Sequence, residues 1–502
     1  MHRQCPGEAG NAPMHHPTNI VPRPSGRRHA AGQALVLGMV LLMVLCVGGV
    51  LLFNTGQVVQ RKIELTNTAD AAAYSLGVQQ ARVWNFAAYM NRGRVANEVA
   101  VAQMVSMYSW LNQTNDSTIT LWKVLRWGQA IPYVGAAFKV AVQIFKGLDQ
   151  GLRAARGIFR GVATGAIPAL DGINGTYAIA ASTMIEAAGG VDAGLVATEV
   201  VKENSPQAKI SPASWVLLGT QFLEAKDKVL DHHKIRPRAV SRGGDRYRNV
   251  VMESRDEFSR DRSDRLNLFL FGWESKGGTD MVDYNRWAAL DVMDGEVFFD
   301  VFQGPFGNGG AQALPSGTRN FYPGIKSGRN RGSGWYSDYE RKTYAQYDGI
   351  GRSRGRKAQS DPNVKAANGQ RRGAFFRGYQ GLRDYHDLAD DKARTPEGDK
   401  AGPVFTVEVE YDTGEMRTAH QVGLGAGRLE LTEQAQGDRM AAMASAQVYF
   451  NRPNSLFPRL IRGKTDRHRE TGSLFSPYWQ VRLVETGMTE RAALGIGGGV
   501  GP

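Results

Sequence analysis

The sequence predicts an α+β protein in which a single transmembrane helix continues into a long helical region, followed by a glycine-rich C-terminal domain that contains β-strands. Three observations predict this class: an uncharged apolar run over residues 34–53, helical periodicity up to about residue 234, and short strand patterns beyond it. With 502 residues, the chain has room for about two or three folded units.

The composition is that of a folded protein, with 42% hydrophobic and 22% charged residues. The 60 glycines exceed average usage, so we expect long irregular loops. The two cysteines, Cys5 and Cys46, both precede residue 54. A disulfide framework or a Cys-ligated metal is therefore excluded after that point, and such a segment suits an oxidising compartment.

We predict that residues 1–33 form a disordered cytoplasmic tail, because they combine several prolines with little apolar periodicity. The pair His15-His16 lies in this tail and is more typical of a surface than of a metal site. Arg23, Arg27 and Arg28 end the tail close to the apolar run.

Residues 34–53 predict a membrane-spanning helix. At 1.5 Å per residue this run covers about 30 Å, the hydrocarbon thickness of a bilayer. The run is too long for the apolar part of a cleaved signal peptide, and it lacks a small-x-small exit site. The preceding arginines favour a cytoplasmic N-terminus and an extracytoplasmic C-terminal bulk. The anchor residues are Ala34, Leu35, Val36, Leu41, Leu45, Leu52 and Phe53.

Residues 54–234 predict a helical extracytoplasmic region. From Gln57 to Trp110, apolar residues recur at spacings of three, four or seven, so the spanning helix is expected to continue, with Gly77 and Gly93 as points where it could bend. One face of this helix is a candidate surface for a partner helix, although solvated charge is the commoner role for a residue such as Asp70. The face consists of Leu65, Ala69, Asp70, Ala72 and Leu76.

A second helix is predicted to begin at Pro132. Its apolar residues from Phe138 to Val162 alternate gaps of three and four, which is a heptad seam. Lys139, Lys146, Arg153 and Arg160 repeat every seven residues on another face, so the helix could form a hairpin with the first or lie on a membrane surface; the seam favours the hairpin. Further helices are predicted over Ala169–Asn204 and Ala213–His233.

Residues 235–493 predict an α+β extracytoplasmic domain, and the glycine-rich end, 494–502, predicts a flexible tail. In Phe405–Tyr411 apolar and polar residues alternate strictly, which predicts a strand with one buried and one acidic face. Other predicted strands are Leu266–Phe271, Glu296–Phe302, Ala446–Phe450 and Tyr478–Val484.

The net charge of +13 is concentrated in a basic loop, residues 326–383, which holds 14 Lys and Arg against 4 Asp and Glu, interleaved with aromatics. In the cytosol such a segment would suggest a nucleic-acid-binding arm. Beyond a membrane we expect no nucleic acid, and two interpretations stay open: a solvated loop whose aromatics pack on the domain, or contact with acidic envelope polymers. The candidate polyanion contacts are Arg352, Arg354, Arg356, Lys357, Arg371 and Arg372.

Motifs that could carry catalysis are incomplete. Ser353 lies in a G-x-S-x-G match with Asp384 and His386 downstream, but it lacks the hydrophobic strand and the helix that a nucleophile elbow needs. A tethered hydrolase using Ser353 is therefore a remote alternative. The run Gly463-Lys464-Thr465 has Pro458 where a phosphate-binding loop has its first glycine.

The remaining histidines, at His232-His233, His386 and His420, lack the spacing that places metal ligands on one face. We predict no catalytic residue, no cofactor and no metal site. The protein is thus expected to act through its membrane anchor and its surfaces.

The run Gly32-Gln33-Ala34-Leu35-Val36, the apolar span and then Ala69-Asp70-Ala71-Ala72-Ala73 resemble the N-terminus of the TadE/TadG-like proteins of tight-adherence (Flp) pilus assembly. The continuation from Arg82 to Trp110 is similar to a long-chain subgroup of that family. The resemblance implies a non-enzymatic protein of the bacterial inner membrane, with a periplasmic domain that builds or anchors a pilus. Its implied partners are other pilus-assembly or pilin-like proteins.

The sequence departs from the family pattern in two places. Leu37 stands where a prepilin-peptidase site after Gly32 would have glutamate, so we do not expect processing or pilin-like polymerisation. No D-x-S-x-S sequence occurs, so the adhesive role of von Willebrand domains is not transferred. A membrane-tethered envelope protein that binds acidic polymers is the alternative function.

Overall fold

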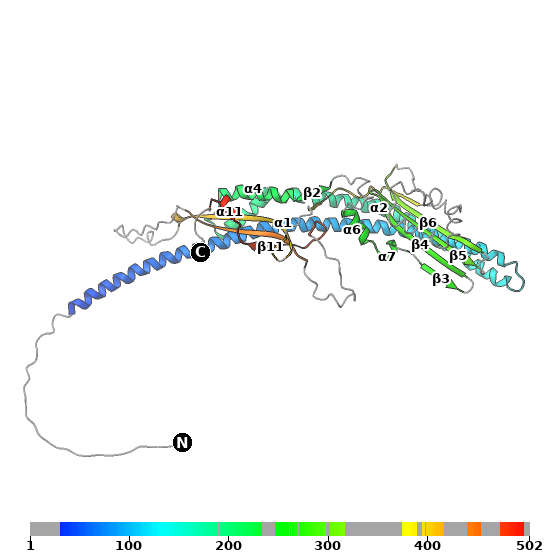
Figure 1. Cartoon of the computed structure of the whole chain (residues 1–502), viewed down its shortest axis with the longest axis horizontal. Coiled ribbons are helices and arrows are strands. Elements are labelled where there is room, and N and C mark those ends of the chain that lie inside the picture. The colour runs from blue at the N-terminus through cyan, green and yellow to red at the C-terminus, as the bar shows by residue number, and fades with distance from the viewer. Residues whose placement is uncertain are drawn as a thin grey trace, which may run out of the picture. The chain divides into compact units, whose positions relative to one another are not determined.

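The computed structural model contains two compact units, Met1–Ile63 with Thr413–Asp438, and Glu64–Asp412 with Arg439–Pro502. Figure 1 labels its helices and strands. Both helices and sheets are present, which confirms the α+β class. The residues that the structure describes are 31–188, 191–232, 246–260, 262, 264–268, 271–297, 302–316, 374–388, 394–396, 398–415, 439–452 and 472–495.

A single helix, α1 (Ala31–Gly128), contains 98 residues and confirms the predicted continuation of the apolar run into a long helix. Its residues up to Ile63 belong to the first unit, together with the short 3-10 helix η1 (Thr413–Glu415). The helix runs through Gly77 and Gly93 without interruption. A side chain at Gly77 would meet Val481, and one at Gly93 would meet Tyr177, so these glycines allow close packing and do not cause bends.

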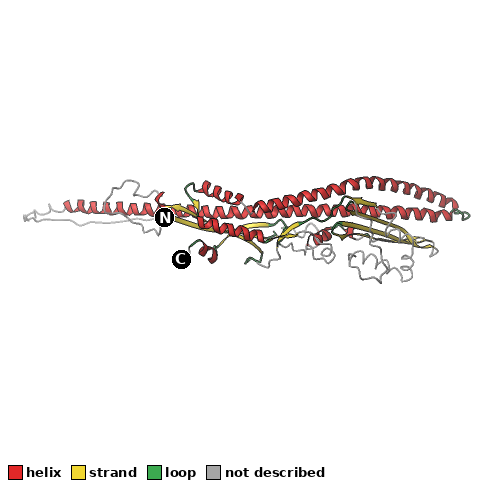
Figure 2. Cartoon of the chain, turned by 90° about the horizontal axis from the view of Figure 1, so that it is seen from above, coloured by secondary structure: helices red, strands yellow, loops and turns green. Residues whose placement is uncertain are grey.

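In the second unit, α1 and α2 (Gly135–Ala188) form the predicted hairpin, side by side in Figure 2. Asn115 of α1 donates to Asp149 of α2 at 2.7 Å, and Asn97 donates to Asn174 at 2.8 Å. Pro132 lies in the turn, and α2 begins three residues later than predicted, at Gly135. α2 continues through Pro168 to Ala188, and α3 (Val191–Asn204) follows, so the predicted helix from Ala169 to Asn204 is divided.

The predicted heptad seam of the second helix is only partly correct. Phe138, Phe145, Leu152 and Phe159 are half-buried, and Phe159 stacks with Tyr108 of α1 at a ring distance of 6.5 Å. Leu148, Ala155 and Val162 of the same predicted seam are exposed. The half-buried residues and the exposed residues thus lie in two different rows on the helix. The reason is that the centre of the buried face of α2 is formed by other residues, namely Val142, Asp149, Ala163 and Ile167.

A four-stranded antiparallel sheet in the order β1-β9-β10-β11 contains three of the predicted strands. They are β9 (Lys400–Asp412), β10 (Arg439–Phe450) and β11 (Trp479–Val484), and β1 is Lys209–Ile210. The predicted acidic face of β9 is not exposed. Thr406 and Glu408 are buried, because α4 (Pro212–Asp227) covers this strand.

Side chains of α4 and its N-cap bind the part of the β9 edge that the two-residue strand β1 leaves unpaired. The backbone amide of Thr406 donates to Gln221, and that of Glu408 donates to Ser214. The N-cap residue Ser211 donates to the Glu408 carboxylate at 2.6 Å. The backbone amides at this sheet edge, which would otherwise be unpaired, therefore find hydrogen-bond acceptors within the chain.

Two sheets differ from the sequence prediction. The end of the helix predicted over Ala213–His233 is instead the strand β2 (Val229–His232), which pairs with β8 (Tyr385–Leu388). The predicted strands Leu266–Phe271 and Glu296–Phe302 each include the end of one strand and the start of the next. The five-stranded sheet has the order β3 (Asp264–Leu268), β4 (Phe271–Asp283), β5 (Arg286–Val297), β6 (Phe302–Leu314) and β7 (Ala374–Arg377), with β7 parallel to β6.

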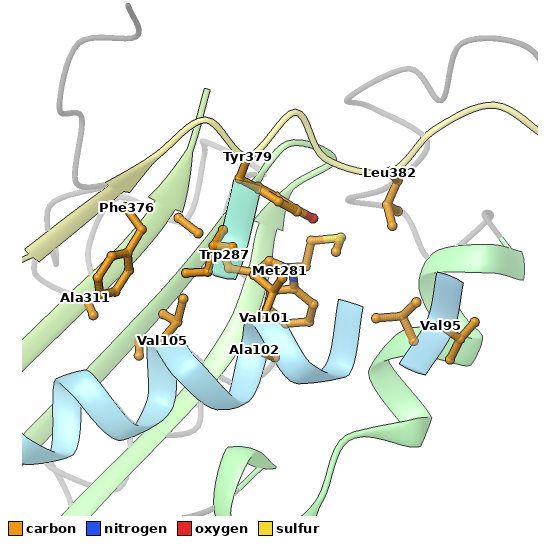
Figure 3. Packing of buried hydrophobic residues seen from close by; sticks show 14 of the residues in the cluster. Val95, Val101, Ala102, Val105, Met281, Trp287, Ala311, Phe376, Tyr379 and Leu382 are labelled. Carbon is orange, nitrogen blue, oxygen red and sulfur yellow. The ribbon is translucent and has the colours of Figure 1, made fainter. Parts of the chain in front are cut away.

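One hydrophobic core cluster of the second unit lies between α1 and the five-stranded sheet. Val101, Ala102 and Val105 on α1 face Met281, Trp287, Ala311, Phe376 and Tyr379 (Figure 3). The short helices α6 (Arg246–Ser254) and α7 (Glu257–Arg260) complete this region, and α11 (Met488–Ala493) follows β11.

Glycines of β6 allow the strand to approach the backbone of α1. A Cβ on Gly309 would lie 2.0 Å from the carbonyl oxygen of Ser109, and one on Gly307 would lie 2.7 Å from the amide of Ser117. Asn112 of α1 also donates to the carbonyl of Gly310 at 3.0 Å. The high glycine content suggested irregular loops, but in β6 the glycines allow the sheet to pack closely against the helix.

We predict that Gly309→Ala lowers the free energy of unfolding by about 2–3 kcal/mol, because the new methyl group meets fixed helix backbone. Guanidinium titration of the detergent-solubilised protein, followed by circular dichroism, measures the change. Gly157→Ala is the control: it lies on α2, where a new methyl group would have no atom within 4 Å, and it should gain about 0.5–1 kcal/mol. Equal stability of the two variants would contradict the packing described.

Candidate functional site on the N-terminal helix

The first unit presents an exposed apolar segment of α1. The predicted anchor residues are all exposed, with relative exposures of 64% for Leu35, 76% for Leu52 and 45% for Phe53. Ala34, Val36, Leu41 and Leu45 belong to the same exposed group. Within the described residues, α1 is the one helix that is long and apolar enough to cross a membrane.

The predicted partner-helix face is mostly buried inside the second unit. Leu65, Ala69, Ala72 and Leu76 have exposures of 0–1%. Burial raises the pKa of Asp70, which is still partly accessible. A partner helix would therefore find only Asp70 of these five side chains at the surface, because the others are occupied by the protein's own packing.

Further along, six polar residues of α1 bind other segments, and we call them the polar spine: Asn85, Asn91, Arg92, Arg94, Asn97 and Glu98. Asn85 binds β11 as a neighbouring strand would: its amide nitrogen donates to the carbonyl of Trp479 at 2.9 Å, and its oxygen accepts from the amide of Trp479 at 3.0 Å. Trp84 packs edge-to-face on the ring of Trp479 at 4.6 Å. The start of β11 is thus fixed to the helix.

The next residues of the polar spine bind backbone carbonyls of two distant loops. Asn91 donates to Leu474 and Arg92 to Phe475, both at 2.8 Å. The fully buried Arg94 donates to the carbonyls of Arg383 and Asp384, at 2.9 and 3.0 Å, and its guanidinium lies over the ring of Tyr247. These contacts join segments more than 280 residues apart in sequence to one helix.

Glu98 is the most deeply buried charge of the polar spine, with no exposed surface. Its carboxylate accepts hydrogen bonds from the hydroxyl of Tyr379 at 2.6 Å, the indole of Trp287 at 3.2 Å and the amide of Asn174 at 3.0 Å. One side chain therefore connects α1 to α2, to β5 and to the segment that follows β7.

Burial raises the pKa of Glu98 from 4.5 to about 6, although the hydrogen bonds from Tyr379 and Trp287 act in the opposite direction. Nearby Asp171 raises the pKa further, and Arg94 lowers it. The pKa of Tyr379 is raised well above its usual value, first by burial and then by the adjacent Glu98. Both groups are enclosed and bound to each other, an arrangement suited to a structural role.

The residues of the alternative hydrolase are engaged in structural contacts where the structure describes them. The backbone carbonyl of Asp384 accepts from Arg94, and the His386 imidazole is bonded to Ser182 at 2.8 Å. Ser353 lies outside the described residues, as do His15-His16, His233, His420 and the run Gly463-Lys464-Thr465. No group of three or more potential metal ligands occurs in the described part of the chain.

The polyanion site stays a prediction. Its six candidate contacts, Arg352, Arg354, Arg356, Lys357, Arg371 and Arg372, lie outside the described residues. Arg383, at the end of the basic loop, does have a defined role, because it forms an ion pair with Asp171 of α2 at 2.7 Å.

The segments of the polar spine belong to the resemblance described above, but their burial was not predicted from sequence. The available signal was the recurrence of Asn and charged residues, at positions 85, 91, 94 and 98, on an alanine-rich helix without proline. The spacing of positions 91, 94 and 98 marks one helix face, with position 85 on another, but it does not reveal whether a face meets solvent or protein.

We predict that the contribution of Glu98 to the free energy of unfolding decreases as pH rises from about 4.5 to about 6. The sign follows because the folded state holds the proton more tightly than the unfolded chain does; the expected change is about 2 kcal/mol. The measurement is the stability difference between the wild type and Glu98→Gln, which cannot titrate. A difference that does not vary across this pH range would show that Glu98 ionises as in the unfolded chain.

The helix just described also carries the similarity to known proteins. Residues 31–80 match the model of the Tad family, described as Flp pilus-assembly TadE/G-like. Neither a curated protein nor a solved structure matches the chain. The matched segment covers the exposed apolar part of α1 and its first buried turns, and it ends before the polar spine. The match confirms the predicted resemblance to TadE/TadG-like proteins.

Proposed function

We propose that this protein is a non-enzymatic, membrane-anchored component of Flp/Tad-type pilus assembly or of a related secretion apparatus. The observation that carries the proposal is that the family match at residues 31–80 coincides with a helix whose exposed apolar segment is long enough to span a membrane. Other pilus-assembly or pilin-like proteins are the partners that this function requires.

The proposed topology places residues 1–33 in the cytoplasm, 34–53 in the inner membrane, and 54–502 in the periplasm. Arg23, Arg27 and Arg28 support this orientation, because basic residues are retained on the cytoplasmic side. The absence of cysteine after Cys46 is compatible with an oxidising compartment.

A scaffold function is supported by how the polar chemistry of α1 is used. Glu98 and Arg94 are buried, and their hydrogen bonds go to other parts of the same chain. Polar groups that are bonded in this way stabilise one arrangement of segments, because losing a partner costs about 1–3 kcal/mol per buried group. Such a helix can hold an external domain on a membrane anchor.

The test is deletion of the gene in a strain that makes surface fibres, followed by electron microscopy and an adhesion assay. We expect loss of both fibres and adhesion, restored by the wild-type gene. Normal fibres and adhesion in the deletion strain would refute the proposed function.

Complementation with a double variant, Leu41→Arg with Leu45→Arg, tests the anchor in the same strain. Two arginines in the apolar run add about 5–7 kcal/mol to the cost of insertion, so the variant should leave the membrane fraction and fail to restore fibres. Leu41→Ile with Leu45→Ile is the matched control and should behave as wild type.

A further inference from the structure

Helix α2 carries a second row of uncharged residues that the hairpin with α1 does not use. The row alternates gaps of four and three over 36 residues, and every member is exposed. We call it the outer seam: Ile144, Leu148, Gly151, Ala155, Ile158, Val162, Gly165, Ala169, Gly172, Thr176 and Ile179.

The outer seam lies on a different face of α2 from the one that contacts α1. The α1-facing side includes Asp149 and Asn174, which bond to side chains of α1. Leu148, one residue before Asp149, and Gly172, two residues before Asn174, are exposed, because each residue advances about 100° around a helix.

Single exposed apolar residues are normal on a protein surface, but the outer seam is not a scatter of such residues. Its large members are strongly exposed, with 72% for Ile158, 69% for Ile179 and 63% for Ile144. Eleven consecutive heptad positions without a charge are the pattern of a helix that packs against another helix in a coiled coil.

The flanks of the outer seam indicate which helix fits it. In coiled coils, charged residues beside the seam select the partner. Here both flanks are uncharged, whereas Lys146, Arg153 and Arg160 lie on another face, so two identical helices meet without like-charge repulsion. The flanking positions on one side are small: Gly147, Ala154, Gly161.

These small residues also make room for a close neighbour. At Gly147, Gly151, Gly161 and Gly165, no atom of the chain lies within 4 Å of the position that a Cβ would take. A helix of 36 residues is about 54 Å long and about 10 Å wide, so two such faces would bury about 1,100 Å² in total. That area just exceeds the roughly 1,000 Å² expected of a specific interface.

We propose that the outer seam joins two copies of this chain, α2 against α2, in a coiled-coil dimer. The modest area is typical of a weak, reversible contact. The inference is independent of the proposed function in pilus assembly, since it rests on the exposed side chains of α2 alone.

The experiment is analytical ultracentrifugation of the purified full-length protein in detergent, at concentrations from submicromolar to submillimolar. We expect a concentration-dependent dimer whose dissociation constant rises at least tenfold in Ile158→Glu, because each copy would bring an uncompensated charge into the interface. The matched control is Val216→Glu on α4: its position is 73% exposed, against 72% for Ile158, and it should leave dimerisation unchanged. A monomer at all concentrations, or a dimer that both variants affect equally, would overturn the proposal.

Cysteine cross-linking checks the same contact without adding charge. Val162→Cys, in a background with Cys5→Ser and Cys46→Ser, should form a disulfide-linked dimer under mild oxidation, because Val162 lies near the middle of the outer seam. Val216→Cys in the same background is the control. Equal cross-linking at the two positions would also overturn the proposal.

Discussion

The fold of the second unit depends on hydrogen bonds from the polar spine of α1 to backbone and side chains elsewhere. Glu98 binds Tyr379, Trp287 and Asn174, and Arg94 binds two carbonyl groups of the segment that precedes β8. Because the five side chains involved, those of Arg94, Glu98, Asn174, Trp287 and Tyr379, are buried, an alternative packing would leave a charge or a polar side chain without a partner, at a cost of about 1–3 kcal/mol or more. The spine therefore specifies one arrangement of segments that are distant in sequence.

Small residues let the same helix serve as the axis of two different sheets. Gly77 lies under Val481 of β11, and Gly309 of β6 lies on the carbonyl of Ser109. At these two points, the glycines allow the helix and the strands to approach closely. Between them, the polar spine forms the hydrogen bonds to the other segments. α1 thus combines an exposed apolar segment with a buried structural segment. The Tad family match at residues 31–80 includes parts of both segments, and the proposed scaffold function requires both.

The elements that could be predicted from sequence are those whose pattern is local. The apolar run, the long helix, the hairpin at Pro132 and the strand at Phe405–Tyr411 all follow from periodicity. The long strands β4, β5 and β6 were missed because glycines and buried polar residues, such as Gly277 and Asp291, interrupt their alternation. The role of Glu98 could not be predicted, because its partners lie at positions 174, 287 and 379, and only the tertiary fold brings them together.

Native-state hydrogen exchange of the full-length protein in detergent tests the central claim that α1 is the structural axis of the second unit. The amides of α1 between Asn85 and Glu98 should exchange only on global unfolding, as slowly as those of the central strand β10. Exchange of these amides as fast as that of α11, a six-residue helix that buries none of its residues, would contradict the claim.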